Sequence, residues 1–384
     1  MDFAFNSDQE LLRQTLAEFS ARELAPHYLA RDKDEDLPRE VVSKLAGMGL
    51  CAPMVGQQYG GQELDYVSLG IAHEEIARGD FNAAYILLLS GLVGAIIASQ
   101  GDERQKQAIL PPICRGEVVP ALGVTEPTGG SDAAHVKLAA RREGDGYILD
   151  GEKTSISFAS WADTVLVMAR TGTYEQGARG VSAFYIDLHS PGVSRNRFKD
   201  LGSRAIGRGQ LFFDSVRVGA NARIGGEGAG FVQVMQGFDF SRSMIGLMCI
   251  GAAQQSVEET CKYVADRQAF GGSLARFEGI SFPLAEAAIK LRAARLLCYE
   301  ALWLKDQGKP HGWIAAGAKW WAPELAAQVL HQCLLLHGHM GFSMDSPHQQ
   351  RMRDVIGLEI GDGTAQIMKL LVARAILGNV ARGY

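Results

Sequence analysis

The chain has 384 residues, of which 47% are hydrophobic and 21% are charged, and its net charge at pH 7 is −5. This composition is typical of a globular protein, and the length suits two or three packed domains better than a single core. The slightly acidic balance gives no basic surface for nucleic acid or for an anionic membrane. We therefore expect neither of them as a partner.

The N-terminal segment, the most apolar stretch and the cysteines predict the cellular compartment and whether a metal site is present. The first fourteen residues, MDFAFNSDQELLRQ, lack the basic and apolar regions of a signal peptide. The most apolar stretch, residues 83–99, is short for a membrane span and is interpreted as a buried core helix. The six cysteines are scattered without paired spacing, which favours buried reduced thiols over a zinc site or a disulfide framework. We expect a cytoplasmic protein without a metal site.

Apolar residues at helical spacing predict an all-helical N-terminal domain over residues 1–119. Its first helix starts at Ser7 to Glu10, a run that resembles a capping box. Its last helix is expected to be closed by Pro111 and Pro112. The predicted helices of this domain cover residues 7–19, 41–48, 66–78, 82–100 and 103–113.

From Pro120 onward, short β-forming runs separated by Gly or Asp turns predict a β-barrel or sandwich domain over residues 120–229. The glycine-rich run from Gly225 to Gly230 is interpreted as a loop that joins two domains. The predicted strands cover residues 136–142, 146–150, 164–170, 181–187 and 211–218.

Helical periodicity then returns and predicts a C-terminal helical domain over residues 230–384. The predicted helices cover residues 231–268, 282–306, 313–336 and 365–377. The fold class is therefore α+β with several domains: an N-terminal helical domain, a middle β-barrel or sandwich, and a C-terminal four-helix bundle. Because several helices are apolar on more than one face, some are expected to lie in a subunit interface.

The segment Gly123 to Asp132 carries the strongest functional signal. It begins as a β-like run and continues as turn-forming residues, so it exposes backbone N–H groups and hydroxyls to a ligand. With five further segments in the same order, it resembles the acyl-CoA dehydrogenase family. Those segments are Tyr59-Gly-Gly-Gln-Glu-Leu-Asp65, Leu149 to Ser157, Arg267-Gln-Ala-Phe-Gly271, His337 to Phe342 and Gly361-Asp-Gly-Thr-Ala-Gln366.

The resemblance implies FAD bound between the middle domain and the C-terminal helices, with a neighbouring subunit completing the site. The residues that it places along the isoalloxazine ring are Leu122, Val124, Thr125, Ser155, Ile156 and Ser157. Those that it assigns to the pyrophosphate and the rest of FAD are Gly130, Ser131, Arg267, Phe270, Gly338, Gly341, Thr364 and Gln366.

The family's usual base is a glutamate in the Gly-Thr turn, and here that position is Asp362. The base removes the α proton of the thioester while the flavin takes the β hydride on the opposite face. An aspartate is shorter than a glutamate by about 1.5 Å. Two alternatives are that Asp362 only caps the helix starting near Thr364, or that Asp239 or Glu359 is the base; we rank both carboxylates below Asp362.

For the acyl-CoA substrate, the resemblance points to Ser131, Asp239, Arg242, Gly363, Leu87 and Gly91. An alternative for Arg242 is a structural ion pair with Asp239, one helical turn away. The expected acyl pocket lies along residues 83–99, which carry no charge, so it favours a compact hydrophobic acyl group over a dicarboxylic one. Asp362 and Ser155, which stands where the family often has Trp, resemble the cyclohexanecarboxyl-CoA dehydrogenase branch.

The expected activity is therefore FAD-dependent dehydrogenation of cyclohexane-1-carboxyl-CoA to cyclohex-1-ene-1-carboxyl-CoA. The resemblance further implies an electron-transfer flavoprotein as acceptor and a homo-oligomer, with a tetramer favoured over a dimer. The alternatives are a nitroalkane-oxidase-like flavin oxidase, a dehydrogenase of short or branched acyl-CoA or of acyl groups on a carrier protein, and a protein that binds FAD without catalysis.

Overall fold

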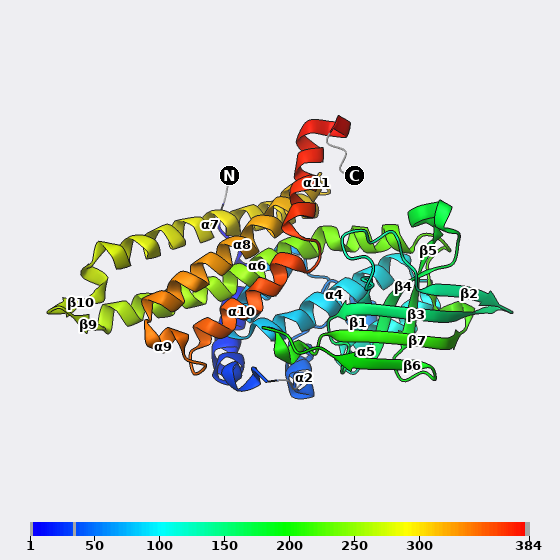
Figure 1. Ribbon diagram of the computed structural model, residues 1–384, viewed down its shortest axis with the longest axis horizontal. Coiled ribbons are helices and arrows are strands. Elements are labelled where there is room, and N and C mark those ends of the chain that lie inside the picture. The colour runs from blue at the N-terminus through cyan, green and yellow to red at the C-terminus, as the bar shows by residue number, and fades with distance from the viewer. Residues whose placement is uncertain (1–2, 34–35, 381–384) are drawn as a thin grey trace.

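The computed structural model describes residues 3–33 and 36–380, apart from the side chains of Asp239, Phe240 and Asn379. Helices from the two ends of the chain pack together, and a middle domain built on one sheet lies at one end of the molecule (Figure 1). This order confirms the predicted fold of a helical domain, a β domain and a helical bundle.

The N-terminal helices are α1 (Ser7–Phe19), α2 (Arg39–Gly47), α3 (Tyr66–Gly79), α4 (Phe81–Gln100) and α5 (Glu103–Cys114). The capping box of α1 is formed one residue earlier than predicted, by Asn6 and Gln9. Pro111 and Pro112 lie inside the last turn of α5 and do not close it, because the N–H of Arg115 still reaches the carbonyl of Pro111.

Helix α4 is the core helix of this half of the molecule. Among the described helices it alone is long and apolar enough to cross a membrane, but 89% of its most apolar window is buried inside the protein. Asp80 caps it by accepting hydrogen bonds from the backbone N–H groups of Asn82 and Ala83. The prediction of a buried core helix is thus confirmed.

The middle domain contains β1 (Pro120–Gly123), β2 (Ala139–Glu143), β3 (Gly146–Ile156), β4 (Thr164–Arg170), β5 (Val181–Asp187), β6 (Val193–Arg197), β7 (Gly209–Val218) and β8 (Arg223–Ile224). The sheet order is β6-β7-β3-β2-β4-β5-β8, and β1 runs parallel to β4. Strand β2 starts later than predicted because the N–H groups of Lys137 and Leu138 donate to the Glu126 carboxylate. The strands β1, β6 and β8 were not predicted, since each is short, and β6 is an edge strand of mostly polar residues.

The C-terminal domain contains α6 (Gly230–Asp266), β9 (Gln268–Ala269), β10 (Gly272–Ser273), α7 (Glu278–Asp306), α8 (Gly312–Leu336), α9 (His339–Phe342), α10 (Pro347–Ile360) and α11 (Ala365–Leu377). The start and end of α11 agree with the prediction, whereas α10 was missed. Its buried face carries the polar residues His348, Gln350, Arg351 and Asp354, which hide the apolar period.

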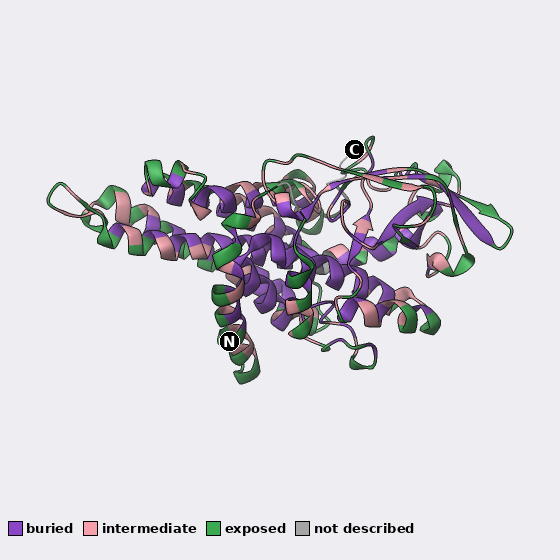
Figure 2. Cartoon of the chain, turned by 90° about the horizontal axis from the view of Figure 1, so that it is seen from below, coloured by how far each residue is buried: buried purple, intermediate pink, exposed green. Residues whose placement is uncertain are grey.

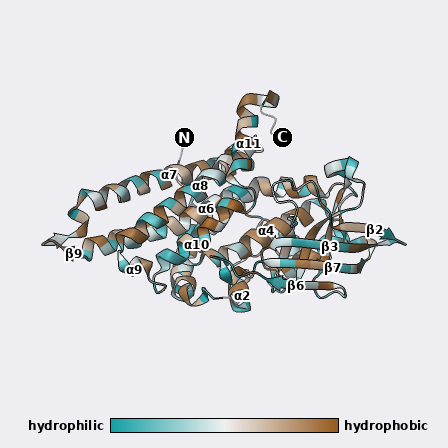
Figure 3. Cartoon of the chain, viewed as in Figure 1, coloured by the Kyte–Doolittle hydropathy of each residue, from teal (hydrophilic) through white to brown (hydrophobic). Residues whose placement is uncertain are grey.

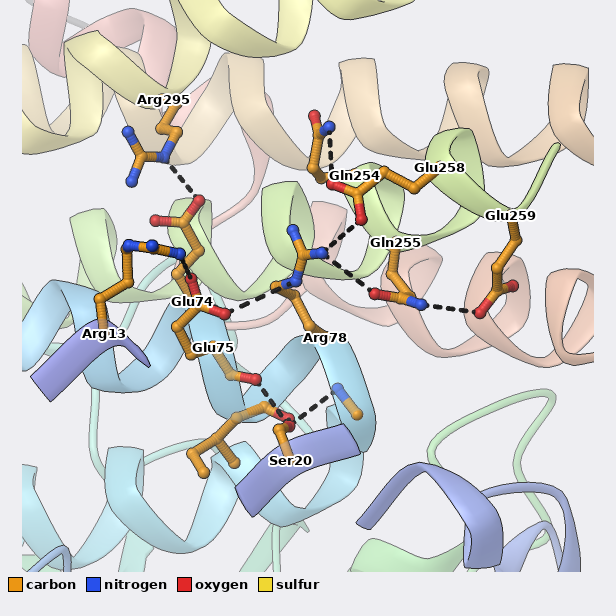
Figure 4. Close-up of polar contacts among 12 residues, drawn as sticks. Arg13, Ser20, Glu74, Glu75, Arg78, Gln254, Gln255, Glu258, Glu259 and Arg295 are labelled. Carbon is orange, nitrogen blue, oxygen red and sulfur yellow. Dashed lines mark hydrogen bonds and ion pairs between the residues drawn. The ribbon is translucent and has the colours of Figure 1, made fainter. Parts of the chain in front are cut away.

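A buried network of charges joins α3 to the C-terminal bundle (Figure 4). The Glu74 carboxylate accepts hydrogen bonds from Arg295 Nε and from the Tyr299 hydroxyl of α7, each at 2.6 Å. Arg78 forms an ion pair with Glu258 of α6, also at 2.6 Å. These contacts bind the two helical domains to each other as one body.

Buried residues fill the centre of the molecule, whereas the end of the helical bundle at β9 and β10 is largely exposed (Figure 2). Five of the six cysteines are buried as free thiols, but Cys261 on α6 is exposed, which corrects the expectation that all are buried. No group of His, Cys, Asp or Glu among the described residues is arranged to hold a metal ion.

Candidate active site

The turn between α10 and α11 presents Asp362 in the left-handed backbone conformation, with φ of 55°, and Gly363 follows with φ of 102°. Aspartate tolerates this region better than most residues because its short side chain bonds locally. The cap of α11 is Thr364, whose side chain accepts a hydrogen bond from the N–H of Ile367. Thr364 therefore performs the capping role, and the carboxylate of Asp362 is left for another function.

Three side chains from the bundle influence the Asp362 carboxylate. Ser241 Oγ on α6 lies 3.5 Å from Asp362 Oδ2. Burial raises the pKa of Asp362, and the positive charges of Lys319 and Arg242 and the contact with Ser241 oppose that rise. Asp362 is thus a half-buried carboxylate within the electrostatic influence of two cations, which is an environment that suits a proton acceptor.

Glu359, the other described carboxylate that we considered as a base, lies in different surroundings. Burial raises its pKa, followed by the negative charge of Glu324 on α8, while Lys319 acts in the opposite direction. Neither Ser241 nor Arg242 is among the groups that shift it. The charged surroundings therefore favour Asp362 over Glu359, and the side chain of Asp239, the remaining candidate, lies outside the described residues.

Lys319 on α8 was not identified from the sequence. Its side chain is 1% exposed, and its ammonium donates to the carbonyls of Leu358 at 2.7 Å and Gly363 at 2.9 Å. The sequence did contain a signal for this role. Lys319 is the one lysine of a largely apolar helix, and a lysine that is buried must find polar partners.

The segment Gly123 to Asp132 lies against β3 and is fixed by a second buried lysine. Lys153 Nζ donates to Glu126 Oε1 at 2.7 Å and to the carbonyl of Val124 at 3.1 Å. The N–H of Thr154 donates to the carbonyl of Thr125 at 2.9 Å. These bonds bring together the two predicted flavin-facing segments, which contain Leu122, Val124, Thr125, Ser155, Ile156 and Ser157. The supporting roles of Glu126 and Lys153 were not predicted.

The polar edge of this surface suits a cofactor with many hydrogen-bonding groups. Gly130, Ser131 and Ser155 are exposed, and Ser155 has a positive φ of 59° that turns it out of β3. Arg208 Nη1 donates to Ser155 Oγ at 3.1 Å, so an arginine lies beside the position where the family often has Trp. Exposed hydroxyls and backbone with a nearby cation fit the polar edge and phosphates of FAD.

A second set of predicted cofactor residues lies at the far end of the bundle. Arg267 and Phe270 lie at the β9–β10 hairpin, and Gly338 and Gly341 lie at α9, away from the sheet (Figure 1). Phe270 is 89% exposed. Thr364 and Gln366 lie instead beside Asp362, at the start of α11. A single chain therefore does not bring all the predicted FAD residues together.

The predicted acyl-pocket residues lie on α4, where Leu87 and Gly91 are buried. Ser90 serves packing, because it donates to the carbonyl of Ile86 and accepts from the N–H of Ala52. Gly94 gives room to Ala52, since an added Cβ would lie 2.9 Å from the Ala52 side chain. These two residues therefore join α4 to the loop that follows α2.

The helical, β and helical order, with a polar loop on the sheet and a half-buried carboxylate on the bundle, is that of the FAD-dependent oxidoreductases that act on CH–CH bonds. The chain belongs to the acyl-CoA dehydrogenase family. The N-terminal, middle and C-terminal domains of acyl-CoA dehydrogenases match residues 6–117, 121–216 and 228–377.

Three known proteins illustrate this similarity. The human mitochondrial short-chain specific acyl-CoA dehydrogenase is 35% identical over 98% of this chain and 90% of its own length. The butyryl-CoA dehydrogenase from Megasphaera elsdenii has a TM-score of 0.94 at 30% identity, covering 98% of this chain and 100% of its own. A chain from a structure described as the electron transferring flavoprotein of Acidaminococcus fermentans has a TM-score of 0.95 at 33% identity, covering 99% of this chain and 100% of its own.

Proposed function

We propose that this protein dehydrogenates an acyl-CoA thioester between Cα and Cβ, with Asp362 as the base that takes the α proton. The observation that supports this role most directly is the position of the Asp362 carboxylate, which is half-buried, lies beside Ser241 within the influence of Arg242 and Lys319, and has no capping duty. Bound FAD supplies the acceptor for the β hydrogen and its electron pair.

The chain's own residues divide the remaining work. Thr125 and Ser157 would donate hydrogen bonds to the flavin ring, and Gly130 and Ser131 would hold the pyrophosphate. The thioester lies along Ser131, Arg242 and Gly363, and hydrogen bonds to its carbonyl stabilise the negative charge that develops when the α proton leaves. Leu87 and Gly91 on α4 lie towards the acyl group.

For the acyl group we propose an alicyclic ring, as in cyclohexane-1-carboxyl-CoA. The Asp362 carboxylate reaches about 1.5 Å less far than that of a glutamate. A substrate with a bulky Cα best fills the space that the shorter side chain leaves. A short or branched acyl group is the second candidate, since two relatives, at 35% and 30% identity, are named for short-chain acyl-CoA and butyryl-CoA.

Anaerobic flavin reduction with a panel of acyl-CoAs tests this proposal. We expect cyclohexane-1-carboxyl-CoA to bleach the flavin absorbance fastest, with linear short-chain esters at least about tenfold slower, because one poorly filled methylene-sized space costs about 1–3 kcal/mol. Fastest reduction by butyryl-CoA would select the second candidate. Oxygen consumption with a nitroalkane and no bleaching by any thioester would instead indicate an oxidase.

The Asp362→Glu variant is the control for the length argument. We expect it to retain partial activity and to shift preference towards linear acyl-CoAs, because its carboxylate reaches further. Glutamate is less tolerant than aspartate of the φ of 55° at this position, so a stability cost of about 1–2 kcal/mol is expected as well. An unchanged substrate profile would contradict the length argument.

We further propose that the protein is a homo-oligomer, a tetramer rather than a dimer, and that it passes its electrons to an electron-transfer flavoprotein. The two sets of cofactor residues lie at opposite ends of the folded molecule. A second copy of the chain would therefore supply Arg267 and Phe270 to complete each site. Phe342 is 82% exposed at the same end, and the distal part of α11 carries hydrophobic residues away from the body (Figure 3).

Sedimentation equilibrium of the FAD-loaded protein tests the assembly. We expect a mass of four 41.5 kDa chains. A mass of two chains would keep the shared cofactor site and contradict the tetramer, whereas a single FAD-loaded chain would contradict both. Reoxidation of the reduced protein by a purified electron-transfer flavoprotein, measured against reoxidation by oxygen, tests the acceptor.

A further inference from the structure

Lys319 lies on α8 beneath the turn that carries Asp362. It holds the backbone on both sides of the carboxylate, because one of its hydrogen bonds goes to Leu358 in the last turn of α10 and the other to Gly363, directly after Asp362. Its side chain is almost fully covered by protein. A single buried group thus fixes the helix end that precedes the base and the residue that follows it.

The turn needs such a support. The last carbonyls of a helix have no partner within that helix, and Leu358 is among the last residues of α10. Asp362 and Gly363 both have positive φ, so the backbone between the helices is not held by regular hydrogen bonds. An ammonium group at this position satisfies two carbonyls and also complements the negative end of the α10 dipole.

Lys319 also interacts electrostatically with the charged groups around it. The groups that act on it are the carboxylate of Asp362, Cys249 and Arg242 from α6, and Glu359 from α10. Burial lowers the pKa of Lys319 to about 8, and the Asp362 carboxylate is the largest influence in the opposite direction. For Asp362, in turn, Lys319 is the largest influence that opposes the effect of burial. The two groups therefore stabilise each other's charged forms.

We propose that Lys319 is a positioning residue for the base: its ammonium holds the turn through the Leu358 and Gly363 carbonyls and places a buried positive charge beside the Asp362 carboxylate. This inference rests on the proposed function, in which Asp362 takes the α proton. Lys319 itself does not contact the reacting atoms. Its removal displaces the carboxylate from the substrate's Cα and makes the carboxylate harder to ionise.

The test compares Lys319→Met, Lys319→Gln and Lys319→Arg with the wild type, each loaded with FAD. The rate of flavin reduction by the best acyl-CoA of the panel is measured by anaerobic stopped flow from pH 5.5 to pH 8.5. We expect Lys319→Met to be about 100-fold slower at pH 7, since a displacement of about 1 Å has an effect of that size. The KM for the acyl-CoA should change little.

The pH profile separates positioning from a purely structural role. The base accepts a proton only when ionised, so the rate falls as pH drops through the pKa of Asp362. Without the neighbouring cation that pKa is higher, and the fall should begin at a higher pH in Lys319→Met and Lys319→Gln than in the wild type. Lys319→Arg keeps the charge and should restore the wild-type pH profile.

Other ionisable groups around the site could also affect the pH profile. Burial raises the pKa of the Cys249 thiol and the Tyr85 hydroxyl, which stay protonated in this range, and Arg242 stays charged. Glu359 is the remaining carboxylate, and Glu359→Gln should leave the profile of the wild type unchanged. If Lys319→Met fails to fold, Lys319→Gln, which retains a hydrogen-bond donor without the charge, carries the test.

Folded, FAD-loaded Lys319→Gln with the wild-type rate and pH profile would overturn the inference. That outcome is distinct from failure of the proposed function, in which the flavin of the wild type itself would not be reduced by any acyl-CoA. A variant that is slower by the same factor at every pH would also overturn the electrostatic part of the inference.

Discussion

Asp362→Asn is expected to keep its FAD and to lose about 10³-fold or more of the rate at which acyl-CoA reduces the flavin. A positioned general base contributes about 10²–10⁴-fold, and asparagine cannot accept the α proton. Asparagine also tolerates the positive φ of 55° at this position, so the turn should persist. The measurement is anaerobic stopped-flow bleaching, with FAD content determined on the same sample.

Glu359→Gln is the matched control, because it removes the other described carboxylate near the turn. It should reduce the flavin at a rate within about twofold of the wild type, because Glu359 is not among the groups that shift the pKa of Asp362 and substitutions outside such networks generally have small effects. Loss of activity in Glu359→Gln with retention in Asp362→Asn would transfer the role of base to Glu359. Retention in both would remove this turn from the mechanism.

The sequence located the proposed base but not its surroundings. Asp362 is recognised because it lies within a short contiguous motif, Gly361 to Gln366, and local sequence also predicts α11 with its observed ends. The groups that tune the carboxylate are distant along the chain: Lys319 is 44 residues from Gly363, and Ser241 is 121 residues from Asp362. Their approach depends on how α6 and α8 pack, which no local pattern reveals.

The missed helix α10 and the late start of β2 share a physical cause, which is polar side chains that serve the interior. Helix α10 buries Asp354, which accepts hydrogen bonds from Tyr28, Asn82 and the N–H of Ser203. It therefore joins three parts of the chain while lacking an apolar stripe. Strand β2 begins late because the Glu126 carboxylate takes the N–H groups that a strand would have used. Patterns of hydrophobicity identify faces packed by apolar contact and miss those packed by hydrogen bonds.

Lys153→Met should lower the free energy of unfolding by about 3–5 kcal/mol, because removing one partner of a buried ion pair leaves the other charge uncompensated. Lys153 is 0% exposed and Glu126 is 6% exposed, and the pair also holds the Val124 carbonyl. Since Val124 and Thr125 belong to the proposed flavin surface, FAD affinity should fall with stability. Denaturant unfolding and FAD titration measure the two effects.

Lys290→Met provides the matched control for burial. Lys290 pairs with Glu286 on the surface of α7 at 2.7 Å, the same distance as in the Lys153–Glu126 pair. An exposed pair one helical turn apart contributes about 0.3–0.5 kcal/mol, because water and salt screen it. If the two substitutions destabilised the protein equally, the cost would come from the loss of lysine as such. A large loss of stability confined to Lys153→Met would show that the buried Lys153–Glu126 pair holds the predicted flavin-facing segment against β3.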